Sequence, residues 1–102
     1  MLELRPICEH CACDLAPDCT EARICSYECT FCRTCVDSVL MNVCPNCGGG
    51  FVTRPVRPKT ERRTGVSLTH QAATTVRKHK PLDVPAHHEF AVPLSATAPA
   101  KR

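Results

Sequence analysis

The chain has 102 residues, enough for one domain, and its net charge is +3. It contains ten cysteines but only four aromatic residues, none of them tryptophan. All the cysteines lie between Cys8 and Cys47, and a foldable core of this size is marginal without added cross-links. No stretch is long and apolar enough to span a membrane. The composition therefore excludes an integral membrane protein and favours a small module held together by disulfides or metal.

The charge is divided unevenly between the two halves of the chain. Residues 1–55 carry four basic and seven acidic side chains, whereas residues 56–102 carry nine basic and three acidic ones. Thiolates bound to divalent metal would make the first half more negative still. An acidic first half is not typical of a nucleic-acid-binding domain. Any contact with nucleic acid is therefore expected through the basic second half.

The cysteine pairs favour metal over disulfides. Residues 1–6 lack the basic start, apolar run and cleavage site of a signal peptide, so we expect a cytoplasmic protein. In a reducing compartment, cysteines paired at short spacing are more often metal ligands than disulfides.

Short strands are expected before the middle of the chain. Leu2–Arg5 alternates apolar and polar residues and predicts a strand that ends at Pro6. Ala22–Cys25 and Glu28–Phe31 predict a hairpin. Phe51–Val52 is expected to pair with the N-terminal strand.

A helix is expected after the hairpin. Thr34 is a suitable N-cap, with Asp37 three residues further on, and Asn42 is a suitable end. The apolar residues between these points recur at helical spacing and form one stripe: Val36, Val39, Leu40 and Val43.

The sequence changes character after Arg54. Residues 55–102 are rich in proline and charge and contain one aromatic residue, Phe90. We therefore expect two parts: a zinc-binding domain over 1–54 and a basic, mostly disordered tail over 55–102. A weak helix over Ser67–Lys80 is an alternative for part of this tail.

Eight cysteines form four pairs at metal-ligand spacing. Zinc prefers four ligands in a tetrahedron and binds thiolates well, so these pairs predict two structural zinc ions without an open coordination position. The pairs can be shared between the ions in an interleaved or a sequential way, and we favour interleaving. The predicted ligands are Cys8, Cys11, Cys25, Cys29, Cys32, Cys35, Cys44 and Cys47. Cys13 and Cys19 are expected to be free thiols, with substitute ligands or a disulfide formed on oxidation as the alternatives.

The order of the pairs, the Phe31-Cys32-x-x-Cys35 step and Cys44-Pro45-x-Cys47 resemble a RING finger, a cross-braced, treble-clef-like zinc domain. The resemblance covers residues 8–47 and implies a small α+β fold with a hairpin and one helix. The fourth ligand of that family is usually histidine, and here it would be Cys29. The aliphatic residue that ligases of this family carry in the first knuckle is replaced by Glu9-His10, and the basic residue after the last cysteine by Gly48.

The first 58 residues also resemble a family of short bacterial proteins of unknown function. Two segments carry this resemblance: the opening Met-Leu-Glu-Leu-Arg-Pro, and the block from Ile24 to Gly49 with its motifs ICSYECTFC and CPNCGG. Cys13 and Cys19 fall outside that family's usual cysteines. The resemblance implies zinc binding and a small cytoplasmic protein, and it implies no reaction.

These observations favour a non-enzymatic zinc-binding module that binds another protein, without a membrane contact or a small-molecule substrate. No residues pair a nucleophile with a base, so we expect no catalytic site. Three alternatives remain: a RING-type ubiquitin-ligase-like adaptor, an iron–sulfur or redox protein, and a nucleic-acid-binding protein that uses the basic tail. The iron–sulfur alternative comes from Cys29-x2-Cys32-x2-Cys35, which opens like a ferredoxin motif but lacks its fourth cysteine.

Overall fold

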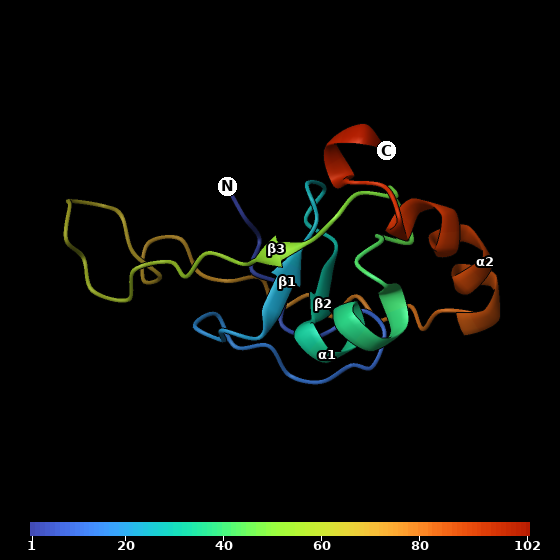
Figure 1. Cartoon of the computed structure of the whole chain (residues 1–102). Helices are drawn as coiled ribbons and strands as arrows, with labels where there is room; N and C mark the ends of the chain where they lie inside the picture. The colour runs from blue at the N-terminus through green and yellow to red at the C-terminus, as the bar shows by residue number, and fades with distance from the viewer.

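A computed structural model describes all residues from 1 to 102. It shows a small α+β protein in which a three-stranded sheet lies beside a short helical segment, and a second helix comes from the C-terminal half (Figure 1). No helix has the length and apolar character that crossing a membrane requires. In chain order the elements are β1 Ala22–Ile24, β2 Thr30–Cys32, α1 Arg33–Cys35, η1 Val36–Leu40, β3 Val52–Thr53, α2 Val84–Ser95 and η2 Pro99–Lys101.

The predicted hairpin is present, but each strand is one residue shorter than expected and the second is shifted toward the C-terminus. β1 and β2 run antiparallel, and Arg23 lies opposite Phe31. Glu28 has a positive φ of 65°, a conformation that closes the turn between the strands. β3 adds to the free edge of β1, so the strand order is β2-β1-β3.

The predicted strand at Leu2–Arg5 is wrong, and with it the expected pairing of Phe51–Val52. This segment forms no strand, and Leu4 adopts a positive φ of 57°. Side chains satisfy its backbone in place of a ladder. Arg57 donates to the Leu2 carbonyl, and the Leu2–Arg5 segment is thereby held without a neighbouring strand.

The helical segment after β2 begins earlier than expected. Its N-cap is Cys32, whose sulfur accepts a hydrogen bond from the Cys35 N–H (3.4 Å), so the predicted Thr34 cap is wrong. α1 continues into η1, a π-helix, and ends where Met41 and Asn42 take positive φ values of 57° and 55°. The predicted apolar stripe is confirmed, because its residues face the interior.

Cysteines make up more than half of the main core cluster. Phe31 and Phe51 meet edge to face, with ring centres 5.5 Å apart. The eleven residues of the core cluster are Cys8, Leu15, Ala22, Cys25, Cys29, Phe31, Cys32, Cys35, Val36, Leu40 and Cys44. Six of these eleven are cysteines, so aliphatic and aromatic packing alone fills little of this interior.

The expected disorder of residues 55–102 is also wrong. A loop around residues 58–66 extends away from the sheet, and the chain then returns along the module as a C-terminal arm, residues 67–102 (Figure 1). Backbone hydrogen bonds hold the arm in place: the Thr74 N–H donates to the Glu3 carbonyl (2.9 Å), and the Lys80 N–H donates to the Glu9 carbonyl (2.8 Å). The composition of the arm predicted disorder, because composition alone contains no information about contacts with the module.

The helix of the arm lies at α2 rather than at Ser67–Lys80, where none forms. Asp83 caps α2 by accepting from the Ala86 N–H (3.2 Å). His87 is 5 % exposed, and its Nε2 donates to the Leu40 carbonyl at the end of η1 (3.0 Å). This contact fastens α2 to the helical segment of the module.

Arg54 is a buried guanidinium that joins three segments. It is 2 % exposed and donates to the carbonyls of Arg5 (2.8 Å), Leu15 (3.3 Å) and Ala16 (2.9 Å). No carboxylate pairs with it, and burial lowers the pKa of Arg54. Its fork of donors therefore satisfies loop carbonyls that no ladder serves.

We expect Arg54→Ala to lower the free energy of unfolding by about 3 kcal/mol, because it leaves buried carbonyls unsatisfied. Arg54→Lys is the matched control: it keeps the charge, but it cannot reach all three carbonyls and should recover only part of the loss. Urea unfolding of the metal-loaded protein measures both. An alanine variant as stable as the parent would show that these hydrogen bonds contribute nothing.

Candidate metal centre

Four cysteine sulfurs meet in a first group formed by Cys8, Cys11, Cys13 and Cys32. Their Sγ atoms all lie within 4.8 Å of one another. The Sγ atoms of Cys11 and Cys32 are 3.8 Å apart. Because a zinc–sulfur bond is about 2.3 Å long, sulfurs at the corners of a tetrahedron around zinc lie about 3.8 Å apart. The group therefore fits a tetrathiolate metal site.

A tight loop brings the N-terminal thiols of this group together. The Cys8 N–H donates to the Cys13 carbonyl (2.9 Å), and the Ala12 N–H donates to the Cys8 carbonyl (2.9 Å). Ala12 has a φ of 64°, which is unfavourable for a residue with a Cβ. This left-handed turn directs the chain back, so that Cys13 joins the same group as Cys8 and Cys11.

The second group contains Cys25, Cys44 and Cys47, whose sulfurs also lie within 4.8 Å of one another. Cys25 directly follows β1, whereas the other two sit in the knuckle after η1. Cys29 lies beside this group and is buried; its sulfur accepts from Asn46 Nδ2 (3.4 Å), and its carbonyl accepts from the Cys25 N–H (3.2 Å). The second group thus offers three close thiols with a fourth next to them.

Backbone N–H groups point at several of these sulfurs. The Tyr27 N–H donates to Cys25 Sγ (3.3 Å), and the Gly49 N–H donates to Cys47 Sγ (3.4 Å). Such bonds stabilise the thiolate, which is the form that binds metal. All ten cysteines are free thiols, so no disulfide competes for them.

Gly48 shapes the second knuckle. Its φ of 77° is favourable only without a Cβ, and its N–H donates to the Cys44 carbonyl (2.8 Å). A Cβ here would lie 3.5 Å from side-chain atoms of Phe90 and Leu94. The knuckle therefore supports both the second thiol group and one side of α2.

Without metal, most of these thiols hold their protons tightly. Burial raises the pKa of Cys25 to about 11, and a hydrogen bond with Cys29 adds to this rise. Burial also raises the pKa of Cys8 and of Cys44. For Cys11, burial opposes ionisation, but hydrogen bonds from the backbone and thiol of Cys13 outweigh it and lower the pKa to about 7. A divalent cation would stabilise these crowded thiolates together.

The observed grouping is the interleaved one, since Cys8 and Cys11 meet Cys32 rather than Cys25. Cys35 belongs to neither close group, although its N–H donates to Cys32 Sγ (3.4 Å). Spacing alone did not place Cys13 at this site. The signal for it would have been the C-x2-C-x-C run, which a single left-handed residue can fold back.

The other sequence candidates lie elsewhere. Cys19 packs against the core outside both groups. No histidine joins either group. His10, which lies within the first cysteine pair, accepts from the Leu82 N–H at Nδ1 (3.0 Å) and so helps to hold the arm.

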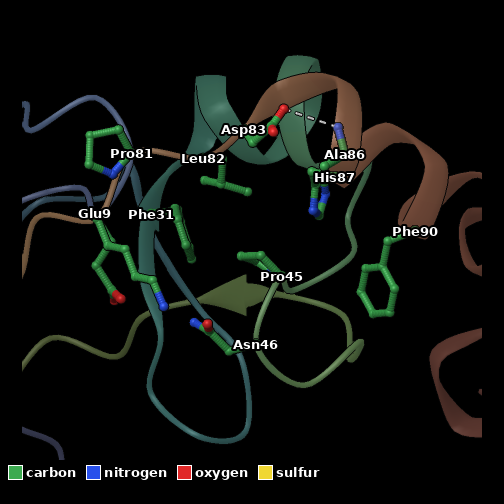
Figure 2. A pocket seen from close by; sticks show the side chains of 11 residues that line it. Glu9, Phe31, Pro45, Asn46, Pro81, Leu82, Asp83, Ala86, His87 and Phe90 are labelled. Carbon is green, nitrogen blue, oxygen red and sulfur yellow. Dashed lines mark hydrogen bonds between the residues drawn. The ribbon is translucent and has the colours of Figure 1, made fainter.

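A cavity of about 320 Å³ lies between the module and the arm, beside Glu9 and Pro45 (Figure 2). Phe31 and Pro45 line it from the module, and Leu82 and His87 line it from the arm. Glu9 is 8 % exposed, and its carboxylate accepts hydrogen bonds from the Thr30 N–H and from Arg5 Nη1. Glu9 therefore holds the first knuckle to β2 as well as bordering the cavity.

These features define a small cysteine-rich α+β module with two thiol groups that can hold metal ions. Residues 1–57 match the model of a family described as "Protein of unknown function (DUF1272)", and the chain belongs to this family. The chain is 49% identical over 81 residues to "Uncharacterized protein R02474" of Rhizobium meliloti (strain 1021). This alignment covers 79% of the chain and 89% of that protein. No solved structure matches the chain.

We expect metal binding to release protons and to strengthen as the pH rises. The pKa of Cys25 is raised to about 11, so this thiol is protonated near pH 7 in the metal-free protein and must lose its proton to bind. Titration of the metal-free chain with zinc, followed with a pH indicator and repeated from about pH 6 to about pH 8, measures both effects. Cys19→Ser should leave the proton count unchanged. An affinity independent of pH over this range would contradict thiol ligation.

Proposed function

We propose that this protein is a non-enzymatic zinc-binding module with a RING-like cross-brace, and that it binds a protein partner. The interleaved grouping of the thiols carries the proposal. Cys8 and Cys11 precede the hairpin and reach Cys32 beyond it, whereas Cys25 within the hairpin reaches Cys44 and Cys47. Two metal ions bound in this way would tie the whole module together.

The proposed role of the metal is structural. Each group offers only thiols, and a site filled by four thiolates leaves no position for substrate or activated water. Zinc binding supplies on the order of 10 kcal/mol of folding free energy in small domains. A core in which six of eleven residues are cysteines needs a contribution of this size. Four thiolates in a tetrahedron favour zinc among the common divalent metals, although an iron–sulfur centre uses the same ligands.

An exposed tyrosine supports a protein partner. Tyr27 stands at the tip of the hairpin between Cys25 and Cys29, and it is 74 % exposed. Tyrosine is enriched at protein interfaces, because it offers a large contact area with few rotatable bonds. Val52, on the edge strand β3, is also exposed. A tip fixed by metal would present Tyr27 without a large ordering cost.

The alternatives draw less support from the surface. The ubiquitin-ligase reading needs a docking groove beside Glu9 and Pro45, and the arm of the same chain lines the cavity at that place. The nucleic-acid reading needs free basic side chains in the second half. Of the nine basic residues there, Arg57 and Arg102 donate to backbone carbonyls of the protein itself, whereas the other seven are exposed.

The purified protein should contain two zinc ions per chain and lose its fold when a strong chelator removes them. Metal analysis and circular dichroism, measured on the same chelator titration, check this expectation. Cys44→Ser should lower the zinc content to one ion by disabling the second group, whereas Cys19→Ser should not change it. A metal-free chain that keeps its full secondary structure would refute the structural role, and visible absorbance with bound iron would favour the cluster alternative.

Tyr27→Ser should reduce capture of the partner without changing the zinc content, because the side chain is exposed and binds no metal. Val76→Ser is the matched control, since Val76 is 58 % exposed but lies on the arm. A pull-down with the intact chain and both variants, quantified by mass spectrometry, measures the difference. Equal capture by the Tyr27 variant and the parent would remove the hairpin tip from the proposed interface.

A further inference from the structure

A fifth cysteine lies next to the four members of the first thiol group. The sulfurs of Cys8, Cys11, Cys13 and Cys32 lie within 4.8 Å of one another. Cys35 adjoins them: its N–H donates to Cys32 Sγ (3.4 Å), and burial together with the neighbouring thiols of Cys32 and Cys11 raises the pKa of its own thiol. Four thiols therefore converge on one position and a fifth borders them, whereas zinc takes four.

Two of the five thiols approach this position from independent segments. Cys13 comes from the N-terminal loop, which the left-handed Ala12 folds back and the hydrogen bond from Cys8 to the Cys13 carbonyl closes. Cys35 comes from the last residue of α1. The thiols of Cys11 and Cys32 contribute to the raised pKa of both. Cys13 and Cys35 therefore border the same two ligands, Cys11 and Cys32.

We propose that Cys13 and Cys35 share the fourth coordination position of the first metal centre. Cys13 is the ligand in the conformation of this structure, and Cys35 is the reserve ligand that can replace it. The proposal rests on the proposed function, because it requires zinc at this group. It differs from the ligand set expected from spacing, in which Cys35 is a permanent ligand and Cys13 is free.

The exchange needs no oxidant or other reactant. When Cys35 replaces Cys13, the bond from zinc to the Cys13 sulfur breaks and the bond to the Cys35 sulfur forms. The proton of the Cys35 thiol leaves, and the released Cys13 thiolate takes up one proton. The number of bound thiolates stays at four, so the charge of the centre does not change.

Exposure separates the two thiols and makes the exchange measurable. Cys35 is 6 % exposed, whereas Cys13 belongs to the exposed residues. An alkylating reagent can reach an exposed Cys13, and zinc binding would protect it. Burial and the thiols of Cys11 and Cys32 raise the pKa of Cys13 to about 12 in the metal-free fold, so the unprotected rate is measured after chelation has unfolded the module. Bound Cys13 leaves the reserve thiol inside the core, where reagents reach it slowly.

Zinc content and cobalt spectra of cysteine variants test the proposal. Cys13→Ser and Cys35→Ser should each keep two zinc ions per chain and, with Co²⁺, the absorption of four thiolates at the first centre. The double variant should lose high-affinity zinc at that centre, weakening binding by at least about tenfold. Cys19→Ser controls for loss of an unrelated thiol, and Cys32→Ser should empty the first centre.

Alkylation with N-ethylmaleimide gives an independent measurement. Zinc should slow labelling of Cys13 in the intact chain by at least about tenfold, and chelation should restore it. Labelling of Cys13 as fast with zinc as without it would overturn the proposal. The proposal would also be overturned if either single variant, Cys13→Ser or Cys35→Ser, lost the first zinc. It would be overturned too if the double variant kept that zinc. An intact chain that binds no zinc would instead refute the proposed function itself.

Discussion

The fold depends on what happens to a set of buried thiols. Six of the eleven residues in the core cluster are cysteines, and burial makes ionisation of several of them unfavourable. A cysteine core without metal is a set of small, weakly cohesive side chains. With a divalent cation, the same side chains become short cross-links between segments that are distant in the sequence. In the proposed arrangement, metal binding and folding of the module are therefore one equilibrium.

The local patterns of the cysteine-containing half were enough to predict much of its structure. The hairpin follows from its two short runs around Ser26-Tyr27, and the apolar stripe follows from residues that recur at helical spacing. The interleaved grouping followed from pairing the knuckles across the chain. Each of these features depends on residues close in sequence or on ligand spacing, which sequence reasoning can evaluate.

The errors occur where distant groups decide the structure. Leu2–Arg5 alternates like a strand, but arginine side chains satisfy the carbonyls of Leu2 and Arg5 and the Thr74 N–H satisfies that of Glu3, so no partner strand is needed. Cys32 replaces Thr34 as the N-cap, because its sulfur already lies at the end of β2. Cys13 joins the first thiol group through the φ of one alanine, which no spacing rule includes.

The arm was missed for a related reason. Its own composition is too polar and too rich in proline to form a core, and disorder is the correct expectation for such a segment alone. The module supplies what the arm lacks: carbonyls for its N–H groups, the Leu40 carbonyl for His87, and the Gly48 knuckle as a surface for α2. Asp83 followed by Pro85 was a helix-start signal in the sequence, and it marks where α2 begins.

The extended loop around residues 58–66 has a consequence for how strongly the arm must bind. The family match ends at residue 57, just before this loop, so the loop links the family's own part of the chain to the arm. A short tether gives the arm an effective concentration in the millimolar range at its docking surface. Contacts too weak to hold a separate peptide therefore suffice to keep the arm docked. Cleavage of the loop would remove this advantage, because a severed arm binds the module only at its own concentration in solution.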